Sequence, residues 1–286
     1  MKLATVEIQG QKRVGLVSQD EKTINLIEAA DMLDVIARWD ALGSKLSASG
    51  AGLPLGEVKL LAPIPLPRRN IICVGKNYRD HAKEFAQSGF EAGAVAGAEI
   101  DTHPAVFSKP PSTVIGPDAV VDTHPGVTDS IDYEVELALV IGRGGKNIKA
   151  ADAFSHIFGY TIVNDVTARD RQKNHKQWFL GKALDTFCPM GPWITTADEV
   201  DAENLDVKTW VNGELRQNAN TRDLIFTIPS LIETISAGMT LEPGDIIATG
   251  TPSGVGIGFK PPKFLKSGDV VKLSISGLGE LTNRFE

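Results

Sequence analysis

The chain carries at residues 133–141 the run Tyr133-Glu-Val-Glu-Leu-Ala-Leu-Val-Ile141, an apolar stretch interrupted by two glutamates. Its branched side chains predict a β-strand, in which residues two apart point to the same face. Glu134 and Glu136 are therefore predicted to project side by side. Two carboxylates in a mostly buried space repel each other and lose hydration unless a cation or protons compensate them. A hard divalent metal ion is the simplest compensating group.

A third acid follows a second predicted strand. Residues 157–164 are β-branched and aromatic, and the strand that they predict ends at Asp165. Three carboxylates without Cys or His at ligand spacing indicate oxygen-only ligation, which suits Mg²⁺, Mn²⁺ or Ca²⁺ better than Zn²⁺. The competing interpretation places Glu134 and Glu136 on the solvated face of an antiparallel strand. The spacing alone leaves both interpretations open.

The composition is that of an ordinary soluble globular protein. Of the 286 residues, 42% are hydrophobic and 23% are charged, which is enough for one large domain with a smaller appendage. The net charge of −7, without a basic cluster, argues against nucleic acid as a partner and favours a small molecule. There is no apolar run of membrane-spanning length, and Cys73 and Cys188 form no disulfide framework. We therefore expect a cytoplasmic protein without a membrane partner.

Proline-rich sequence divides the chain. Residues 3–26 alternate in hydrophobicity as in a short meander, and residues 28–42 have helical periodicity. A run of alternating prolines that ends at Pro67 then marks a boundary. The pattern predicts a small N-terminal α/β domain over 1–67 and a catalytic domain over 68–286.

The larger predicted domain is rich in strands. Only two helices are expected, near 78–87 and 229–237. Because strands follow one another with few helices between them, the pattern indicates a β-dominated α+β fold and not a doubly wound sheet. Extended segments are expected at 70–74, 104–108, 113–115, 132–142, 157–164, 207–212, 244–248 and 268–276.

The first of these helices carries a candidate acid–base pair. His81 and Glu84 are three residues apart and share a helix face. In such a pair the carboxylate orients the imidazole and holds its cation, while the imidazole takes a proton from water. A lone helical His is otherwise a common surface residue. With the small-residue stretch 86–100 that follows, the helix predicts a lid over substrate or, alternatively, a plain mobile loop.

Three polar residues further along the chain are candidates for substrate contact. Arg169 can fork onto a substrate carboxylate with Gln172 beside it, and Lys182 can stabilise a developing oxyanion or enolate. Each residue taken alone is also consistent with a solvated surface. The glycine-rich loop 250–258 matches no nucleotide fingerprint, and we interpret it as a turn whose amides meet an anionic substrate group.

Together these residues resemble the fumarylacetoacetate hydrolase family, with motifs in the family's order over residues 70–286. The resemblance implies a mixed β-roll or sandwich catalytic domain, usually a homodimer, with Mg²⁺ or Mn²⁺ bound by Glu134, Glu136 and Asp165. The matching stretches are 74–82, 107–117, 132–137, 159–172, 181–193 and 241–256.

The resemblance also implies roles for the other candidates. His81 and Glu84 correspond to a water-activating dyad on a lid helix, and Lys182 corresponds to a residue that faces the substrate. The positions that correspond to substrate contacts are Arg169, Gln172 and Thr251.

One position departs from part of the family. Eukaryotic fumarylacetoacetate hydrolases carry a fourth acidic metal ligand seven residues before the His, where this chain has Val74. The chain therefore resembles more closely the smaller acylpyruvase-like and 2-hydroxyhepta-2,4-diene-1,7-dioate isomerase-like members, which have three acids. Water or substrate would complete the octahedron.

The function expected first is a metal-dependent C–C bond hydrolase that acts on acylpyruvates, which are 2,4-dioxo acids. The substrate would chelate the metal, the His81–Glu84 pair would activate water, and pyruvate and a carboxylic acid would leave. The alternatives are oxaloacetate decarboxylation, 2-oxohept-3-ene-1,7-dioate isomerisation or hydration, and ureidoglycolate cleavage, because the fold does not choose the reaction. A more remote alternative is a metal-stabilised binding protein without enzyme activity.

Overall fold

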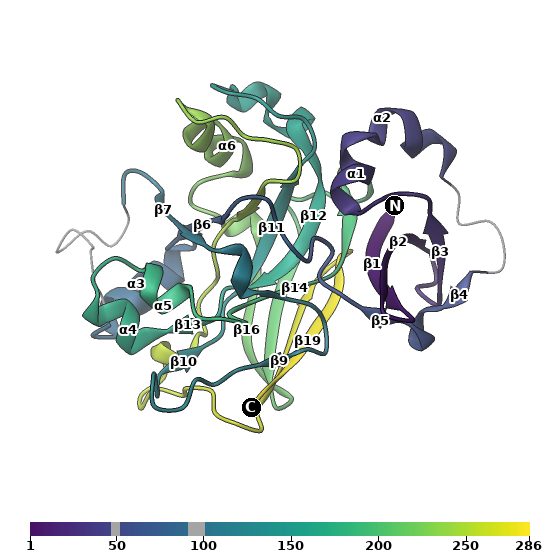
Figure 1. Cartoon of the computed structure of the whole chain (residues 1–286). Helices are drawn as coiled ribbons and strands as arrows, with labels where there is room; N and C mark the ends of the chain where they lie inside the picture. The colour runs from purple at the N-terminus through teal and green to yellow at the C-terminus, as the bar shows by residue number, and fades with distance from the viewer. Residues whose placement is uncertain (47–51, 91–100) are drawn as a thin grey trace.

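The computed structural model describes residues 1–46, 52–90 and 101–286. Strands dominate, and a large sheet packs against a smaller one in the middle of the molecule (Figure 1). In spatial order the large sheet contains β4 (Leu53–Pro54), β3 (Thr23–Ile27), β2 (Gln11–Val17), β1 (Lys2–Ile8), β14 (Cys188–Thr196), β12 (Ile157–Asn164), β11 (Val135–Ile141), β17 (Ile246–Ala248), β6 (Ile71–Gly75) and β7 (Ala105–Lys109), with β5 (Lys59–Leu60) on β1 and β8 (Val114–Ile115) on β14.

The second sheet and the helices complete the described fold. The second sheet contains β16 (Glu214–Asn220), β15 (Asp206–Val211), β18 (Val270–Ile275), β19 (Gly279–Phe285) and β9 (Val120–Val121), and a separate ribbon pairs β10 (Ile131–Asp132) with β13 (Thr167–Ala168). The α-helices are α1 (Met32–Ala37), α2 (Trp39–Leu42), α3 (Arg79–Gln87), α4 (Arg169–Asn174), α5 (Phe179–Lys182) and α6 (Ile228–Ser236).

The two strands that carry the acids lie at the centre of the large sheet and are buried throughout. Alternate residues of β11 face opposite sides. Leu137 belongs to the core shared with the second sheet, whereas Ala138 belongs to the core that α1 closes with Met32. Because both faces are covered, these strands are nearly continuously apolar, and any charge among them needs a specific partner.

The β-dominated α+β fold is confirmed. All eight expected extended segments contain strands, and α3 and α6 lie where helices were expected. The single strand expected over 132–142 is wrong in detail, since the chain leaves β10 after Asp132 and enters β11 at Val135. Glu134 therefore lies in the short connection before β11, where its backbone N–H donates to Asn164 Oδ1 at 3.0 Å.

Strand β14 was not expected, although it is central. Pro189 and Pro192 lie inside it, and proline removes a ladder donor, so the segment does not look like a central strand. The structure accommodates the second proline at an irregularity, because the register between β12 and β14 shifts near Gly191.

The N-terminal segment 3–26 forms the expected meander, β1 to β3, and it extends the large sheet. β1 pairs with β14, placing Leu3 opposite Ile194. The region before residue 67 thus shares backbone hydrogen bonds with the rest of the molecule, and the boundary at 67 stays a prediction.

Among the described residues, no helix is long and apolar enough to cross a membrane.

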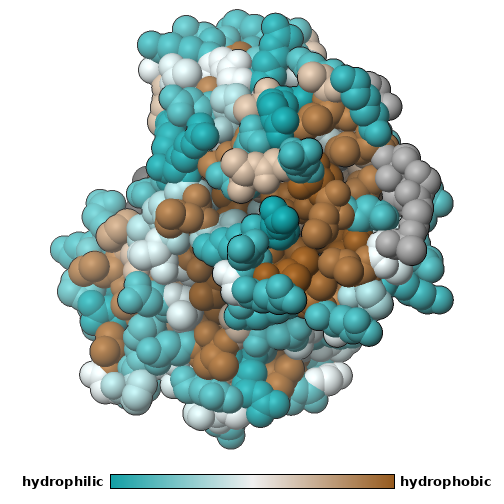
Figure 2. Space-filling view, turned by 45° about the vertical axis from the view of Figure 1, so that its right-hand side comes forward, coloured by the Kyte–Doolittle hydropathy of each residue, from teal (hydrophilic) through white to brown (hydrophobic). Residues whose placement is uncertain are grey.

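One face of the molecule carries exposed apolar residues. Figure 2 shows them gathered among polar ones. In the N-terminal region the exposed large apolar side chains are those of Leu26, Leu53 and Leu66. An apolar patch of this kind is typical of an interface, but the homodimer stays a prediction.

Candidate active site

The three acids predicted from the sequence meet at one point. Glu134 immediately precedes β11, Glu136 lies within it, and Asp165 follows the neighbouring strand β12. The strands are antiparallel, with Glu136 opposite Val163, so the end of β12 lies beside the start of β11. One carboxylate oxygen from each acid lies within 4.8 Å of the others, and all three are buried. The interpretation that the glutamates lie on a solvated face is therefore wrong.

Buried cations surround two of the acids. Lys182 Nζ lies 2.6 Å from Glu134 Oε2 and 2.6 Å from Asp165 Oδ2. Arg169 Nη2 lies 2.6 Å from Glu134 Oε1, and Lys109 Nζ lies 2.7 Å from Asp165 Oδ1. These contacts offset much of the cost of burying the two carboxylates.

Glu136 is placed differently, because its described polar contact is with a neutral group. Its Oε2 accepts a hydrogen bond of 2.9 Å from the backbone N–H of Gly250. Burial, and then the charges of Asp165 and Glu134, raise the pKa of Glu136 well above its ordinary value. For Glu134, burial works in the same direction, but Lys182 and Arg169 outweigh it and lower the pKa.

This donor set fits a hard divalent cation. All three ligand candidates are carboxylates, and Glu136 lacks a neighbouring cation among its described contacts. A divalent ion would bring the charge that lets Glu136 ionise. The cluster can thus hold a metal ion, and the all-oxygen set matches the preference of Mg²⁺ and Mn²⁺.

The predicted acid–base pair is also present. On α3, His81 Nδ1 lies 3.2 Å from Glu84 Oε2, and His81 is buried. The backbone N–H of Gly254 donates to Glu84, 3.0 Å from Oε1. Glu84 also packs so closely on Gly258 that a side chain there would collide with it. The loop that contains Gly254 and Gly258 therefore fixes the Glu84 carboxylate, which in turn orients the His81 imidazole.

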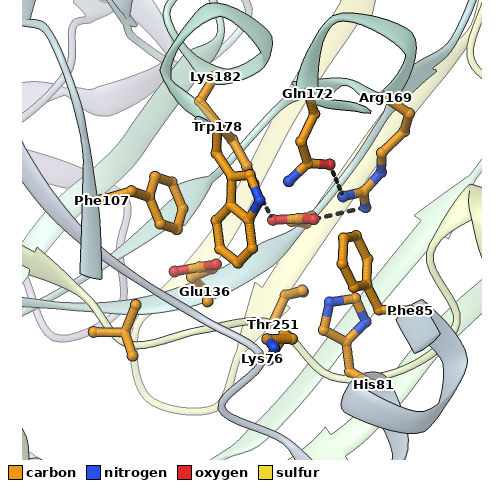
Figure 3. Close-up of a pocket in the computed structure, with 13 residues that line it drawn as sticks. Lys76, His81, Phe85, Phe107, Glu136, Arg169, Gln172, Trp178, Lys182 and Thr251 are labelled. Carbon is orange, nitrogen blue, oxygen red and sulfur yellow. Dashed lines mark hydrogen bonds and ion pairs between the residues drawn. The ribbon is translucent and has the colours of Figure 1, made fainter. Parts of the chain in front are cut away.

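Residues of both groups line one small pocket. Figure 3 shows His81 approaching from α3 below, with Arg169 and Gln172 above the acids. Asp165 and Glu84 do not line the pocket themselves but contact Lys182 and His81, which do. The sequence-predicted residues that line the pocket are His81, Glu134, Glu136, Arg169, Gln172, Lys182 and Thr251.

Arg169 is more engaged with the protein than the sequence indicated. Besides Glu134, its guanidinium contacts Asp132 Oδ2 through Nε at 2.9 Å and Gln172 Oε1 through Nη1 at 3.1 Å. Thr251 likewise accepts a hydrogen bond of 2.8 Å from Gln217. The structure places these side chains in the pocket wall, and their contact with substrate stays a prediction.

The glycine-rich loop 250–258 was interpreted as a source of amides for an anionic substrate. In the structure its backbone N–H groups donate hydrogen bonds to carboxylates of the protein itself: Gly250 N–H donates to Glu136, and Gly254 N–H donates to Glu84. Gly256 N–H lies 2.6 Å from Asp132 Oδ1. These amides therefore position the acids, so the interpretation is wrong for these three glycines.

Several residues in the pocket wall or in contact with it could not be predicted from the sequence. Lys109 ends β7 in an apolar setting, which is a weak signal, and Asp132 sits beside the acidic run. Trp178 and Phe107 form the aromatic wall, with ring centroids 5.3 Å apart. Lys76 lines the pocket beside Gly75, where a side chain would collide with Trp178.

The predicted lid falls partly on residues 91–100, which lie outside the described residues. The described part contains α3, where Phe85 is buried against Val255 and Ile257. Phe90 packs edge-on against Phe264 at 5.8 Å. The helix is thus well anchored, and closure over substrate stays a prediction.

Comparison with known proteins agrees with this site. The family model described as "Fumarylacetoacetate (FAA) hydrolase C-terminal" matches residues 70–286. Oxaloacetate tautomerase YisK from Bacillus subtilis (strain 168) is 49% identical over 309 residues, covering 100% of both chains.

Two solved structures are similar over the whole chain. A fumarylacetoacetate hydrolase from the psychrophile Exiguobacterium antarcticum has a TM-score of 0.85 and 41% identity, covering 100% of this chain and 99% of the other. Maleylpyruvate hydrolase from Sphingobium sp. SYK-6, in complex with manganese(II) ion and pyruvate, has a TM-score of 0.80 and 36% identity, covering 100% and 98%.

Proposed function

The chain belongs to the fumarylacetoacetate hydrolase family, and from that premise we propose that it is a metal-dependent enzyme that interconverts the enol and keto forms of oxaloacetate. The observation that carries the proposal is the full-length, 49% identity to an oxaloacetate tautomerase, together with a buried acid triad beside a His–Glu pair. From the sequence alone, acylpyruvate hydrolysis is expected first and oxaloacetate decarboxylation is among the alternatives, whereas tautomerisation is not. The curated relatives favour oxaloacetate over acylpyruvates as the substrate.

We assign the metal to Glu134, Glu136 and Asp165, and we propose Mg²⁺ or Mn²⁺ as the ion. When bound, such an ion supplies an electrophile for the carboxylate and keto oxygens of a 2-oxo acid. The neighbouring cations have a different task. Lys182 is held charged, because Asp165 and Glu134 raise its pKa against the effect of burial.

The proposed proton transfers use His81 and Lys182. Conversion of the keto form removes a proton from C3 and adds one to the oxygen on C2. His81, oriented by Glu84, lies in the pocket wall and serves as the base at C3. The Lys182 ammonium donates a hydrogen bond to the C2 oxygen as negative charge develops there, and that oxygen takes its proton from solvent. In the reverse direction solvent accepts the proton of the enol hydroxyl, and the protonated His81 returns a proton to C3.

A direct assay tests this function. Enol oxaloacetate absorbs in the ultraviolet more strongly than the keto form, so the decay of absorbance after dilution reports tautomerisation. We expect the protein with Mg²⁺ or Mn²⁺ to accelerate the decay, chelation to abolish the acceleration, and added metal to restore it. Full activity after metal removal would refute the metal assignment, and no acceleration with metal would refute tautomerisation.

Acylpyruvate hydrolysis is the second candidate. The His81–Glu84 pair can also activate water, and a structural relative is a maleylpyruvate hydrolase in complex with manganese(II) ion and pyruvate. Release of pyruvate from acylpyruvates, without acceleration of oxaloacetate tautomerisation, would favour this candidate.

The substitution His81→Ala is expected to lower tautomerisation by about 10²-fold, the usual contribution of a general base. Decarboxylation of oxaloacetate is expected to fall much less, because loss of CO₂ requires no base at C3. Stopped-flow absorbance measures the first rate, and CO₂ release measures the second. His175→Ala, at an exposed position, is the control. Equal losses in both reactions would contradict the role of His81 as a base.

A further inference from the structure

The cations that line the pocket are unequally engaged. Lys182 and Arg169 are both held by the acid cluster, at 2.6 Å from Glu134 in each case. Lys76 also lines the pocket, but its described ion pair is made outside this cluster, where Nζ lies 2.6 Å from Asp101 Oδ2. Within the described residues, Lys76 is therefore the lysine or arginine of the pocket that forms no ion pair with the metal-site acids.

The backbone fixes Lys76 at the pocket. Its φ of 54° is in the left-handed region, which costs a non-glycine residue free energy and is retained where the surroundings impose it. On one side, Gly75 packs against the Trp178 ring. On the other, the buried Asn77 side chain donates to Thr249 O at 2.8 Å and to Phe226 O at 3.1 Å. The strained residue is thus held between two anchored neighbours.

The position of Lys76 complements the metal site. Figure 3 shows Lys76 on the side of His81 and Thr251, with Arg169 and Gln172 on the opposite side of the acids. A 2-oxo acid that meets the metal site through its C1 carboxylate and C2 oxygen extends its remaining carbons into the rest of this small pocket. A second carboxylate there needs a cation, because its burial near Glu134 and Glu136 is otherwise costly.

We propose that Lys76 binds the distal carboxylate of the substrate and makes the site selective for 2-oxo acids with a second carboxylate, exchanging its pair with Asp101 for a pair with the ligand. This inference rests on the proposed function, since it assigns the part of the substrate that the metal site leaves unbound. The Lys76 side chain is 10% exposed and that of Asp101 is 23% exposed, so the exchange takes place at the pocket rim. The flexible lysine stem permits it.

Binding of two unreactive probes tests the proposal. Oxalate can chelate a metal ion through its two adjacent carboxylates but has no distal carboxylate. 3,3-Difluorooxaloacetate has the distal carboxylate, and it cannot enolise because C3 carries no hydrogen. At saturating Mn²⁺ we expect Lys76→Met to lower the affinity for difluorooxaloacetate by about 10- to 100-fold, the range for a lost hydrogen bond to a charged group. Oxalate affinity is expected to stay within about twofold. Calorimetry measures both.

Asp101→Asn is the matched variant, because it removes the partner of Lys76 and keeps the ammonium. We expect it to keep or increase affinity for difluorooxaloacetate. A loss as large as that in Lys76→Met would overturn the proposal, and so would equal weakening of both probes, or of neither, in Lys76→Met. The outcome is separable from the proposed function: wild-type protein that binds the probe but does not tautomerise oxaloacetate refutes that function and leaves the carboxylate site standing.

Discussion

Replacing Glu136 with glutamine is expected to weaken Mn²⁺ binding by more than about 100-fold, and turnover at limiting metal is expected to fall with it. Loss of an outer partner of a ligand already costs about 10- to 100-fold in affinity, so loss of a charged ligand costs at least as much. Glutamine keeps the size of the side chain and can keep the hydrogen bond from Gly250 N–H. The change thus removes charge with little change in packing. Calorimetric titration with Mn²⁺ measures the loss.

The same substitution is expected to stabilise the metal-free protein at high pH. Burial and the neighbouring acids raise the folded-state pKa of Glu136, so its folded state holds a proton more tightly than the unfolded chain does. That contribution is fully present below the unfolded pKa and is lost as pH rises through the folded pKa. Glutamine does not titrate. The melting temperature of metal-free Glu136→Gln should therefore exceed that of the wild type by a margin that grows with pH.

Proton release provides a second measure of the same group. In the wild type, metal binding should release a proton from Glu136 at pH values below its raised pKa, which calorimetry in buffers of different ionisation enthalpy detects. Glu136→Gln should show less release. Glu203→Gln, at an exposed site, is the control for the loss of one negative charge. Wild-type affinity for Mn²⁺ in Glu136→Gln would contradict the assignment of Glu136 as a ligand.

The acid triad was predictable because strand geometry is periodic. Side chains two apart share a face in extended backbone, so Glu134 and Glu136 could be paired from the sequence although β11 begins only at Val135, and Asp165 could be added because it follows a strand of similar composition. The same local reasoning placed His81 and Glu84 together on a helix. Each of these predictions needed only short-range geometry.

The residues that were missed depend on long-range contacts. Lys109 reaches Asp165 across 56 positions, and nothing near Lys109 in the sequence indicates this partner. Strand β14 joins the N-terminal strands to β12 despite its prolines, so its place follows from tertiary pairing and not from local propensity. The same holds for the amides of Gly250 and Gly254, which serve acids more than 100 residues away.

The roles of the pocket cations were the least predictable. Arg169, Lys182 and Lys76 are all plausible carboxylate ligands by residue type. Only their contacts distinguish them. Arg169 and Lys182 form ion pairs with the buried Glu134, whereas Lys76 pairs with Asp101 at the pocket rim. Residue type therefore identifies a class of chemistry, and tertiary structure decides which member of the class remains for the substrate.

Lys182→Met is expected to lower turnover by about 10²- to 10³-fold while metal affinity stays the same or increases. The rate falls because the substitution removes a preorganised donor at the oxygen where charge develops, a loss of the size seen for oxyanion-hole donors. Metal affinity does not fall, because two ligand acids, Glu134 and Asp165, lose a cation that lies 2.6 Å from each and become more negative. Tautomerisation and any decarboxylation of oxaloacetate should fall together, since both place charge on that oxygen.

Lys109→Met is the matched control for this prediction. Lys109 Nζ lies 2.7 Å from the same Asp165, and the residue is equally buried, but it lies outside the pocket wall. Both variants remove one buried ammonium and leave acids less compensated, so both should destabilise the metal-free protein. At saturating Mn²⁺ we expect Lys109→Met to lower turnover by about tenfold, the lower end of the range for loss of an outer partner of a ligand, because the metal site is filled. If both variants lost turnover equally, Lys182 would act only by compensating charge; a much larger loss in Lys182→Met assigns it to the reacting oxygen.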